Sequence, residues 1–232
     1  DIIYHYTHDI SDSRSLSDNT VNCIFEDRAN GIWLGTFGAG ISVYSPRLNL
    51  IKNLTQNAFD TNSLSGNFIW SICEMQDGSL WIGTNATGIN IYDLKTENFR
   101  FLEHDPGNPG SLPEGSVREI CQGMDGTVWI GTDGGGLSRY DPKKGRFRHF
   151  RHDPGDPLSI SSNSVRTIFE DSTGILWVGT RRGLNKFNPI TEKFTRYLHD
   201  SDDSRSLSNN FVYSALYMDK RGFLWVGTYG GG

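Results

Sequence analysis

Three groups of residues in this 232-residue chain could do chemistry, and each suggests a different kind of site. One is a run of three glycines within residues 129–142, WIGTDGGGLSRYDP, whose composition suggests a phosphate-binding loop. Another is a set of histidines followed by aspartate, two residue types that ligate metal ions. The third is a set of three cysteines, whose thiolates could act as nucleophiles. Which chemistry is possible depends on the elements that position these residues.

The spacing of the tryptophans shows that the chain is a repeat. Five of the six tryptophans follow one another at intervals of 48 residues, and only Trp70 lies outside the series. The five are Trp33, Trp81, Trp129, Trp177 and Trp225. Each stands in a similar phrase, such as WIGTNATGINIYD or WVGTRRGLNKFNP, and is expected to be a core residue packed between successive repeats. A period between about 20 and 50 residues indicates a solenoid, a propeller or an array.

The pattern within one period predicts four short antiparallel strands. In the fourth repeat, strands are expected at residues 165–171, 175–180, 183–188 and 193–198, separated by turns that contain Gly or Pro. A Gly or Asn recurs in the first turn, where a positive φ favours these residues. Four such strands in each period of 48 residues are typical of one propeller blade. We therefore predict an all-β fold, a β-propeller of four-stranded blades in a partial, open ring of about five blades.

The repeat also gives expected blade boundaries within one propeller fragment that spans residues 1–232. Four blades are expected at residues 21–55, 69–103, 117–151 and 165–198, with an incomplete fifth at 212–232. Residues 1–6, DIIYHY, match the outermost strand at 146–151, RFRHFR, and are expected to be the outer strand of a preceding blade. The ends of such an open arc would be adhesive strand edges.

The repeat argues against most of the chemistry suggested at the outset. A phosphate-binding loop needs a helix directly after it, whereas LSRYDP is predicted as a strand, so the glycines are expected to form the turn between the second and third strands. The histidines occupy the same position in different repeats, so they should lie in separate blades and not converge on one metal ion. The aspartates that follow them are expected to shape a turn. Cys73 and Cys121 stand where other repeats have Phe or Leu, which predicts small core residues. Neither a metal nor a cofactor is predicted. The histidines are His8, His104, His152 and His199, followed by Asp9, Asp105, Asp153 and Asp200.

Composition argues against nucleic acid as a partner, against a membrane-spanning helix and against a disulfide framework. The net charge is −5, and the basic residues form no run longer than the pairs 143–144 and 181–182, so nucleic acid is not an expected partner. No apolar stretch approaches the ~18 residues that a membrane helix needs. An odd number of cysteines, three, implies no disulfide framework.

Two sets of variable side chains mark the expected binding face. One position follows the Val or Ile that starts the first strand of each repeat, and the other follows each Gly-Thr. In a propeller both positions lie on the same face, beside the central channel. The first set is Asn22, Trp70, Arg118, Arg166 and Tyr213, and the second set is Phe37, Asn85, Asp133, Arg181 and Tyr229.

These ten residues suggest a glycan-binding surface. Their flanking residues are nearly constant across the repeats while they vary, which packing alone does not require. Aromatic rings stack on sugar faces, and Arg, Asn and Asp bind hydroxyls, carboxylates or sulfates. The alternative interpretation is a set of solvated rim residues that vary because nothing restrains them.

The repeated phrases are also similar to those of a known family. The phrases SVRTIFEDSTG, VWIGTDGGGLSRYDP and RHDPGDPLSISSN resemble the two-component-regulator propeller repeats in the periplasmic sensor half of hybrid two-component systems of Bacteroidetes. The resemblance implies seven-bladed propellers, often in tandem, followed by an immunoglobulin-like domain, a membrane helix, and cytoplasmic kinase, receiver and DNA-binding parts. It covers essentially the whole chain. Because only about five repeats and none of the later domains are present, it supports the sensor module and not the kinase.

From this resemblance we expect a non-catalytic periplasmic sensor in a protein of the inner membrane. The resemblance implies that it binds oligosaccharides from complex glycans and controls the genes that degrade them. Its partners would be the rest of the sensor kinase chain and a second copy in a homodimer, and any histidine kinase activity would lie elsewhere in the parent chain.

Two other functions stay open. Propellers also host lyases and glycosidases, but a glycosidase needs two carboxylates about 5–10 Å apart. Asp133 is the one acid among the ten face residues, and Glu26, Glu74 and Glu170 are expected to be turn residues at the far end of the first strand. The second is a protein-interaction scaffold, which the fold alone does not distinguish from a sensor.

Overall fold

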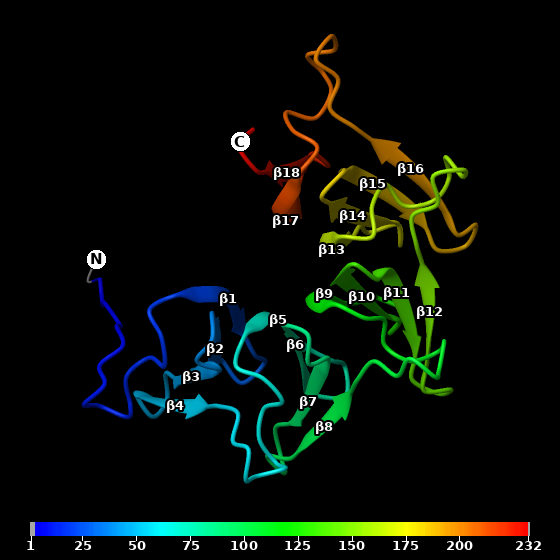
Figure 1. The fold of residues 1–232 in the computed structure, drawn as a ribbon. Coiled ribbons are helices and arrows are strands. Elements are labelled where there is room, and N and C mark those ends of the chain that lie inside the picture. Colours follow the sequence, from blue (N-terminus) through cyan, green and yellow to red (C-terminus); the bar gives the residue numbers. More distant parts are fainter. Residues whose placement is uncertain (1–2, 232) are drawn as a thin grey trace. The chain divides into compact units, whose positions relative to one another are not determined.

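The computed structural model in Figure 1 describes residues 3–231, and this part of the chain consists of strands and turns without a helix. The described residues accordingly include no helix with the length and hydrophobicity of a membrane span. The strands described form four four-stranded antiparallel sheets and one two-stranded sheet, and within each sheet the strands pair in the order in which they follow one another in the chain. The prediction of an all-β propeller built from repeated four-stranded blades is confirmed.

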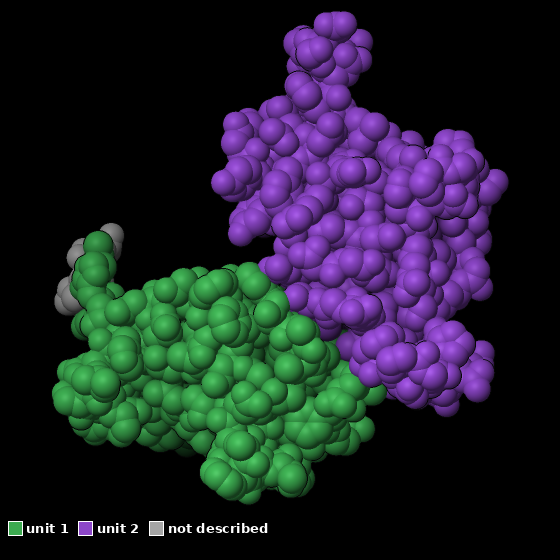
Figure 2. All heavy atoms as spheres, in the orientation of Figure 1, with its two compact units in different colours: residues 1–103 green, residues 104–232 purple. Residues whose placement is uncertain are grey.

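The chain divides into two compact units, Asp1–Glu103 and His104–Gly232, which have different colours in Figure 2. Unit 1 holds blade 1, with β1 (Val21–Glu26), β2 (Ile32–Thr36), β3 (Ile41–Ser45) and β4 (Leu50–Leu54), and blade 2, with β5 (Ile69–Glu74), β6 (Ser79–Thr84), β7 (Ile89–Asp93) and β8 (Phe99–Leu102).

Unit 2 holds two complete blades and a hairpin. Blade 3 has β9 (Ser116–Gln122), β10 (Val128–Asp133), β11 (Gly136–Asp141) and β12 (Arg146–Phe150). Blade 4 has β13 (Val165–Glu170), β14 (Leu176–Thr180), β15 (Gly183–Asn188) and β16 (Lys193–Tyr197), and the hairpin, blade 5, has β17 (Val212–Met218) and β18 (Leu224–Thr228).

Burial along the strands follows their order within a blade. In blade 4, β14 is buried at every residue except the half-buried Trp177. The outermost strand β16 instead alternates, with Phe194 buried while Lys193 and Thr195 face the solvent. This alternation is expected of a strand with only one face on the core, whereas β14 is covered on both faces.

Residues 3–6 do not form the outer strand that the sequence predicts for residues 1–6. They are exposed and lie outside any strand, and residues 1 and 2 fall outside the described residues. An outer strand pairs only with the third strand of its own blade. No such third strand precedes these residues in the described chain, so the matching sequence alone does not produce a strand.

The first hairpin turn of each blade shows where a positive φ is required. Gly78, Gly126, Gly174 and Gly222 adopt φ values of 84°, 83°, 78° and 85°. In blade 1 the same position is taken by Asn30, with φ 64°, and the glycine follows one residue later. Asn tolerates this conformation better than most residues, which explains how blade 1 keeps the turn.

Within each unit, the repeated tryptophan packs against the following blade. Trp33 of blade 1 is 4% exposed, and its ring centre lies 5.8 Å from that of Tyr92 in blade 2. Trp129 of blade 3 is 2% exposed and lies 5.5 Å from Phe187 in blade 4. Trp225 of blade 5, which no further blade follows in the described residues, is 59% exposed. Trp129 also contacts Phe150 of its own blade at 6.1 Å, but the exposure of Trp225 shows that full burial of the indole requires the next blade.

Three of the repeated tryptophans donate the indole N–H to an aspartate of their own blade, and in blade 5 this bond, from Trp225 Nε1 to Asp219 Oδ2, is 3.4 Å long. The Nε1 of Trp33 donates to Asp27 Oδ2 at 2.7 Å, and that of Trp177 donates to Asp171 Oδ2 at 3.0 Å. Hydrogen bonds from Thr173, Trp177 and nearby backbone amides outweigh burial, which acts in the opposite direction, and hold the pKa of Asp171 below its ordinary value. The ionised carboxylate thus orients the indole and closes the first turn.

Within each unit, a glycine two residues after the repeated tryptophan lets successive blades come close together. A Cβ on Gly131 would lie 2.5 Å from Val165 Cγ1, the first residue of β13. The same holds for Gly35 against Ile69, at 2.7 Å, and both distances are below any normal contact. The constant glycine of the repeat is therefore explained by the approach of the next blade.

These contacts predict unequal costs for two tryptophan substitutions. Trp129→Ala should lower the free energy of unfolding by about 3–5 kcal/mol, because it empties a contact between two blades. Trp225→Ala, the matched control, should cost less than about 1 kcal/mol since its ring is largely solvated. Urea unfolding measures both values, and equal losses would contradict the placement of the indole.

Candidate functional site

The first predicted set of site residues lies at an irregularity in the innermost strand of every blade. In blade 3, Thr132 pairs with Val117 and Gly131 pairs with Glu119, so Arg118 is the extra residue of a β-bulge. The pairing of the other innermost strands shifts at the corresponding point. A bulge turns one side chain out of the strand's normal alternation. The residues at these shifts are Asn22, Trp70, Arg118, Arg166 and Tyr213.

The second predicted set lies beside the start of the innermost strand. The amide of Asn85 donates to Phe68 O at 3.1 Å, that of Arg181 to Ser164 O at 3.1 Å, and that of Tyr229 to Phe211 O at 2.8 Å. Within a blade, this places the end of the second strand next to the bulge residue. In each of these blades, the structure therefore places one residue of the second set next to one residue of the first set.

The buried threonine of each Gly-Thr fixes the loop between the second and third strands. Thr36 Oγ1 donates to Gly40 O at 2.8 Å, Thr84 Oγ1 to Gly88 O at 2.7 Å, and Thr180 Oγ1 to Gly183 O at 2.9 Å. In blade 3 the amides of Gly134 and Gly136 both donate to Asn163 O in the segment before blade 4. The glycine run is thus a turn between β10 and β11, as the repeat predicts, and it leads into a strand.

In unit 1 the paired residues form an aromatic group. The ring centre of Phe37 lies 4.7 Å from that of Phe68 and 5.9 Å from that of Trp70, and Trp70 Nε1 donates to Asn85 Oδ1 at 3.5 Å. Phe37 is 48% exposed and Phe68 is 38% exposed. The side-chain Nδ2 of Asn22 donates to Ile69 O at 3.0 Å, so this member of the first set ties blade 1 to blade 2. We call Phe37, Phe68, Trp70 and Asn85 the aromatic group.

In unit 2 the paired residues form a charged group around Asp133. Its Oδ2 accepts hydrogen bonds from Arg166 Nη2 at 2.9 Å and Arg118 Nη2 at 3.3 Å, and its Oδ1 accepts one from Ser164 Oγ at 2.6 Å. The side chains of Arg166 and Arg118 are only 5% and 17% exposed. An isolated bridge between Asp133 and Ser164 also joins blade 3 to blade 4 through the backbone.

Aromatic rings of blade 5 continue this charged group. The guanidinium carbons of Arg166 and Arg181 lie 5.6 Å and 5.5 Å from the ring centre of Phe211. Phe211 in turn lies 5.4 Å from Tyr213 and 5.6 Å from Tyr229. Both tyrosines are more than half exposed. We call Arg118, Asp133, Arg166, Arg181, Tyr213 and Tyr229, with Phe211 and Ser164, the arginine group.

The charges of the arginine group keep Asp133 ionised. Burial alone would raise the pKa of this carboxyl, but the hydrogen bond from Ser164 and the charges of Arg166, Arg118 and Arg181 lower it below its ordinary value. Burial lowers the pKa of the Arg118 and Arg166 guanidinium groups, an effect that the charge of Asp133 opposes. Arginine stays protonated in proteins, so three cations surround one anion.

Phe68, Ser164 and Phe211 belong to these groups but were not predicted as site residues. Each stands directly before the innermost strand of its blade, a position that the sequence places in the connecting segment. The occupants of this position are Thr20, Phe68, Ser116, Ser164 and Phe211. The signal that could have found them is the same variation between constant neighbours that marks the two predicted sets.

Other residues with possible chemistry have structural contacts. The Nδ1 of each of the four repeated histidines donates to a carbonyl of its own loop, as in His104 to Leu112 O at 2.9 Å and His152 to Ile160 O at 2.8 Å. His8 and His199 make the same bond, to Leu16 O and Leu207 O. Cys121 is partly buried and packs against the core shared by blades 3 and 4.

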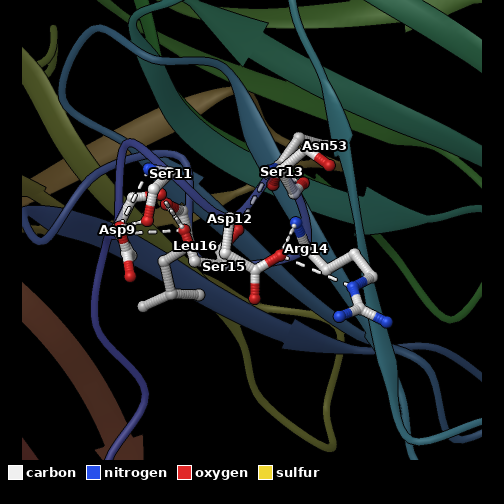
Figure 3. Close-up of polar contacts among 8 residues, drawn as sticks. All are labelled: Asp9, Ser11, Asp12, Ser13, Arg14, Ser15, Leu16 and Asn53. Atoms are coloured by element: carbon white, nitrogen blue, oxygen red, sulfur yellow. Dashed lines mark hydrogen bonds and ion pairs between the residues drawn. The ribbon is translucent and has the colours of Figure 1, made fainter.

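The loop that follows His8 shows how the aspartates act in the repeat (Figure 3). Asp9 Oδ1 accepts hydrogen bonds from the Ser11 amide at 2.9 Å and the Ser11 hydroxyl at 2.6 Å, and Asp12 Oδ1 accepts one from the Arg14 amide at 2.9 Å. Asn53 Nδ2 donates to the carbonyls of Ser13 and Ser15 in the same loop. These bonds define Asx turns, in which the carboxylates serve the loop backbone.

The repeated glutamates at the end of the first strand connect blades. Glu170 Oε2 accepts a hydrogen bond from the Met124 amide at 2.7 Å, and Glu74 Oε2 accepts one from the Arg28 amide at 2.9 Å. Each donor lies in the first turn of the preceding blade. These two glutamates therefore bind a neighbouring turn, a role that goes beyond the turn position expected from the sequence.

Among residues 3–231, no Lys, Arg or His forms an ion pair with the carboxyl of Glu119. Glu119 pairs across the strands with Gly131, whose missing Cβ would meet Val165, so it lies on the face of blade 3 that packs on blade 4. The residue is only half-buried, yet close packing around its carboxyl raises the pKa to about 8, against a hydrogen bond from the Ile120 amide. Its carboxyl is therefore largely protonated at neutral pH.

This raised pKa predicts a pH-dependent effect of Glu119→Gln. In the wild type, the protonated carboxyl of Glu119 makes its full contribution to the free energy of unfolding at pH values below the pKa that this residue has in the unfolded chain. This contribution is lost as the pH rises toward 8. The glutamine variant lacks this loss, so its stability relative to the wild type should rise by about 2–4 kcal/mol between pH 4.5 and pH 7.5. Thermal or urea unfolding at both pH values measures the change.

The matched control is Glu114→Gln, which removes the same charge from an exposed residue. It should show no comparable gain. A stability difference between Glu119→Gln and the wild type that is the same at both pH values would contradict the environment described for this carboxyl.

The five repeats match a known protein family in sequence. A sequence model of the family described as "two component regulator propeller" matches residues 15–38, 63–86, 111–134, 159–182 and 206–230. These segments cover the connecting loop, the first hairpin and the Gly-Thr turn of each blade. No curated protein matches the chain.

Solved structures with the same fold include extracellular domains from Bacteroides thetaiotaomicron. One, from a protein described as a hybrid two-component system, is 26% identical with a TM-score of 0.73, and the match covers 100% of this chain and 35% of that one. A second such domain is 24% identical with a TM-score of 0.73, covering 90% and 26% of the two chains. This chain thus spans about a third or less of their length.

Another neighbour in fold is an enzyme. A catalytically inactive virginiamycin B lyase from Staphylococcus aureus, solved with quinupristin, is 16% identical with a TM-score of 0.60. The match covers 82% of this chain and 60% of the lyase. At this identity the similarity concerns the fold alone.

Proposed function

Because the chain belongs to the two-component regulator propeller family, we propose that it is the sensor module of a hybrid two-component signalling protein and that it recognises oligosaccharides derived from complex glycans. The observation that carries the proposal is the grouping of variable aromatic, amide and charged side chains on bulges and turns that the constant residues of the repeat hold in place. Function placed on loops above a rigid scaffold is common among ligand-binding folds.

The aromatic group of unit 1 has the chemistry of a sugar-binding surface. Phe37 and Phe68 expose much of their rings, and Trp70 and Asn85 lie beside them. Aromatic faces pack on the C–H faces of sugars, and an amide can exchange hydrogen bonds with hydroxyls. The group thus combines apolar area with polar atoms, as ligand sites do.

Location and partners follow from the family and are part of the proposal. The similarity to extracellular domains of hybrid two-component systems supports a place outside the cytoplasm. We propose that this place is the periplasm, that the parent protein is anchored in the inner membrane, and that it acts as a homodimer. Ligand binding would then be passed to the rest of the sensor kinase chain and would regulate genes for polysaccharide use.

The environment of Asp133 favours binding over catalysis. This carboxylate accepts hydrogen bonds from two arginines and a serine, which lower its pKa, so it is a poor proton donor at neutral pH. A glycosidase would also need a second carboxylate on the same face. We therefore propose that this region is not itself an enzyme.

Calorimetric titration of the purified protein with a panel of neutral and acidic oligosaccharides tests the proposal. At least one should bind, and Trp70→Ala should weaken the binding of a ligand of the aromatic group about tenfold, the loss expected for one stacked ring. Phe59→Ala is the matched control, because its ring is 100% exposed on a connecting loop of the same unit.

The control should bind as the wild type does. A panel without any binding oligosaccharide would contradict glycan recognition. Turnover of an oligosaccharide that is abolished by Asp133→Asn would instead show that the region is an enzyme.

A further inference from the structure

We propose that the arginine group of unit 2 binds the negatively charged substituent of an acidic sugar, a carboxylate or a sulfate. The proposal rests on the proposed function, because it assumes a saccharide ligand and names its chemical class. It assigns this class to one group of side chains, contributed by blades 3 and 4 and the hairpin of blade 5.

The balance of charge in the group favours an anion. Arg118, Arg166 and Arg181 supply three positive charges, while Asp133 supplies one negative charge. Asp133 already accepts hydrogen bonds from two of these guanidinium groups, and the third lies over the ring of Phe211. A further anion would therefore meet a site with an excess of positive charge.

The burial of Arg166 is a second and independent observation. Its side chain is 5% exposed, one of its terminal nitrogens is bonded to Asp133, and its Nε is buried without a hydrogen-bond partner in the structure. A buried guanidinium donor without an acceptor is costly, because the group has lost its hydration. A charged acceptor brought by a ligand would satisfy it, and the planar fork of arginine suits the paired oxygens of carboxylate or sulfate.

The tyrosines beside the arginines favour a sugar as the carrier of this anion. Tyr213 is 52% exposed and Tyr229 is 64% exposed, and their ring centres lie 5.8 Å apart. Both rings contact Phe211, over which Arg166 and Arg181 lie. A ligand that packs a sugar ring on a tyrosine would thus have its substituents within reach of the guanidinium groups.

The two units differ in this respect. The aromatic group of unit 1 contains no charged side chain, so its members offer stacking and amide hydrogen bonds to a neutral sugar face. The arginine group combines stacking with cations. Preference for an acidic sugar is therefore assigned to unit 2.

Three oligosaccharides of similar size separate the possible ligands in calorimetric titrations of the purified protein. Tetragalacturonate carries carboxylates, its fully methyl-esterified form carries none, and a κ-carrageenan tetrasaccharide carries sulfate without carboxylate. At least one acidic compound should bind ten or more times more tightly than the methyl ester. The affinity should fall as the salt concentration rises, because charge contributes to binding.

Arg181→Ala tests the site with little risk to folding, because this side chain is exposed. It should weaken binding of the preferred acidic oligosaccharide at least tenfold. Arg221→Ala is the matched control, since it removes the same charge from the turn at the opposite end of the β17–β18 hairpin, where Arg221 pairs with Asp219. The control should leave the affinity unchanged.

The outcomes distinguish this inference from the proposed function. Equal affinity for tetragalacturonate and its methyl ester, with no preference for the sulfated compound, would overturn the acidic preference and leave glycan binding in place. Preferred binding of an acidic compound that Arg181→Ala does not weaken would remove the arginine group from the site. Absence of binding by any neutral or acidic oligosaccharide would overturn both.

Discussion

Within each unit, the packing of a repeated tryptophan against the following blade is the interaction on which the rest of the structure depends. An indole buries roughly 150–250 Å², which contributes about 4–6 kcal/mol by area. Trp33 and Trp129 are almost fully buried in this way, whereas Trp225 is 59% exposed. A blade thus completes its core only with its neighbour, as expected for a repeat architecture.

The same inter-blade contact positions the candidate site. The first residue of β5 or β13 presses on the glycine of the preceding blade, where a methyl group would collide with it. This approach brings the end of the second strand in one blade to the start of the first strand in the next, as the bridges Phe37–Phe68 and Asp133–Ser164 show. Side chains of adjacent blades can therefore share one group, and neither group exists within a single blade.

The fold could be predicted because its determinants recur. Three features recur in every repeat: the tryptophan at a spacing of 48 residues, the glycine of the turn and the Gly-Thr pair. Their recurrence excludes a chance pattern, and their positions within the period give the order of the strands. Residues 3–6 were less predictable, since their strand-like sequence says nothing about whether a pairing partner is present. A strand forms only where a second strand is present to pair with it, and the sequence of one segment does not show whether that partner is there.

The sequence indicates where the candidate residues lie along the strands but not which contacts they make. Variation between constant neighbours identified the bulge residues and the residues after Gly-Thr, and the structure brings them together in pairs. Phe68, Ser164 and Phe211 were missed because they precede the strand, and Asn22 proved to be bonded to the backbone of the next blade. The bridging bonds of Glu74 and Glu170 likewise depend on a neighbouring blade. Such contacts connect residues about one period apart, and no local pattern reveals them.

A double-mutant cycle across the boundary between blades 3 and 4 tests the inter-blade packing most directly. The two substitutions are Trp129→Leu and Phe187→Leu, and urea unfolding gives the stability of each single and double variant. Rings in edge-to-face contact at 5.5 Å should show a coupling energy of about 0.5–1.5 kcal/mol. Additive losses, with a coupling energy near zero, would contradict the claim that the indole is held by the next blade.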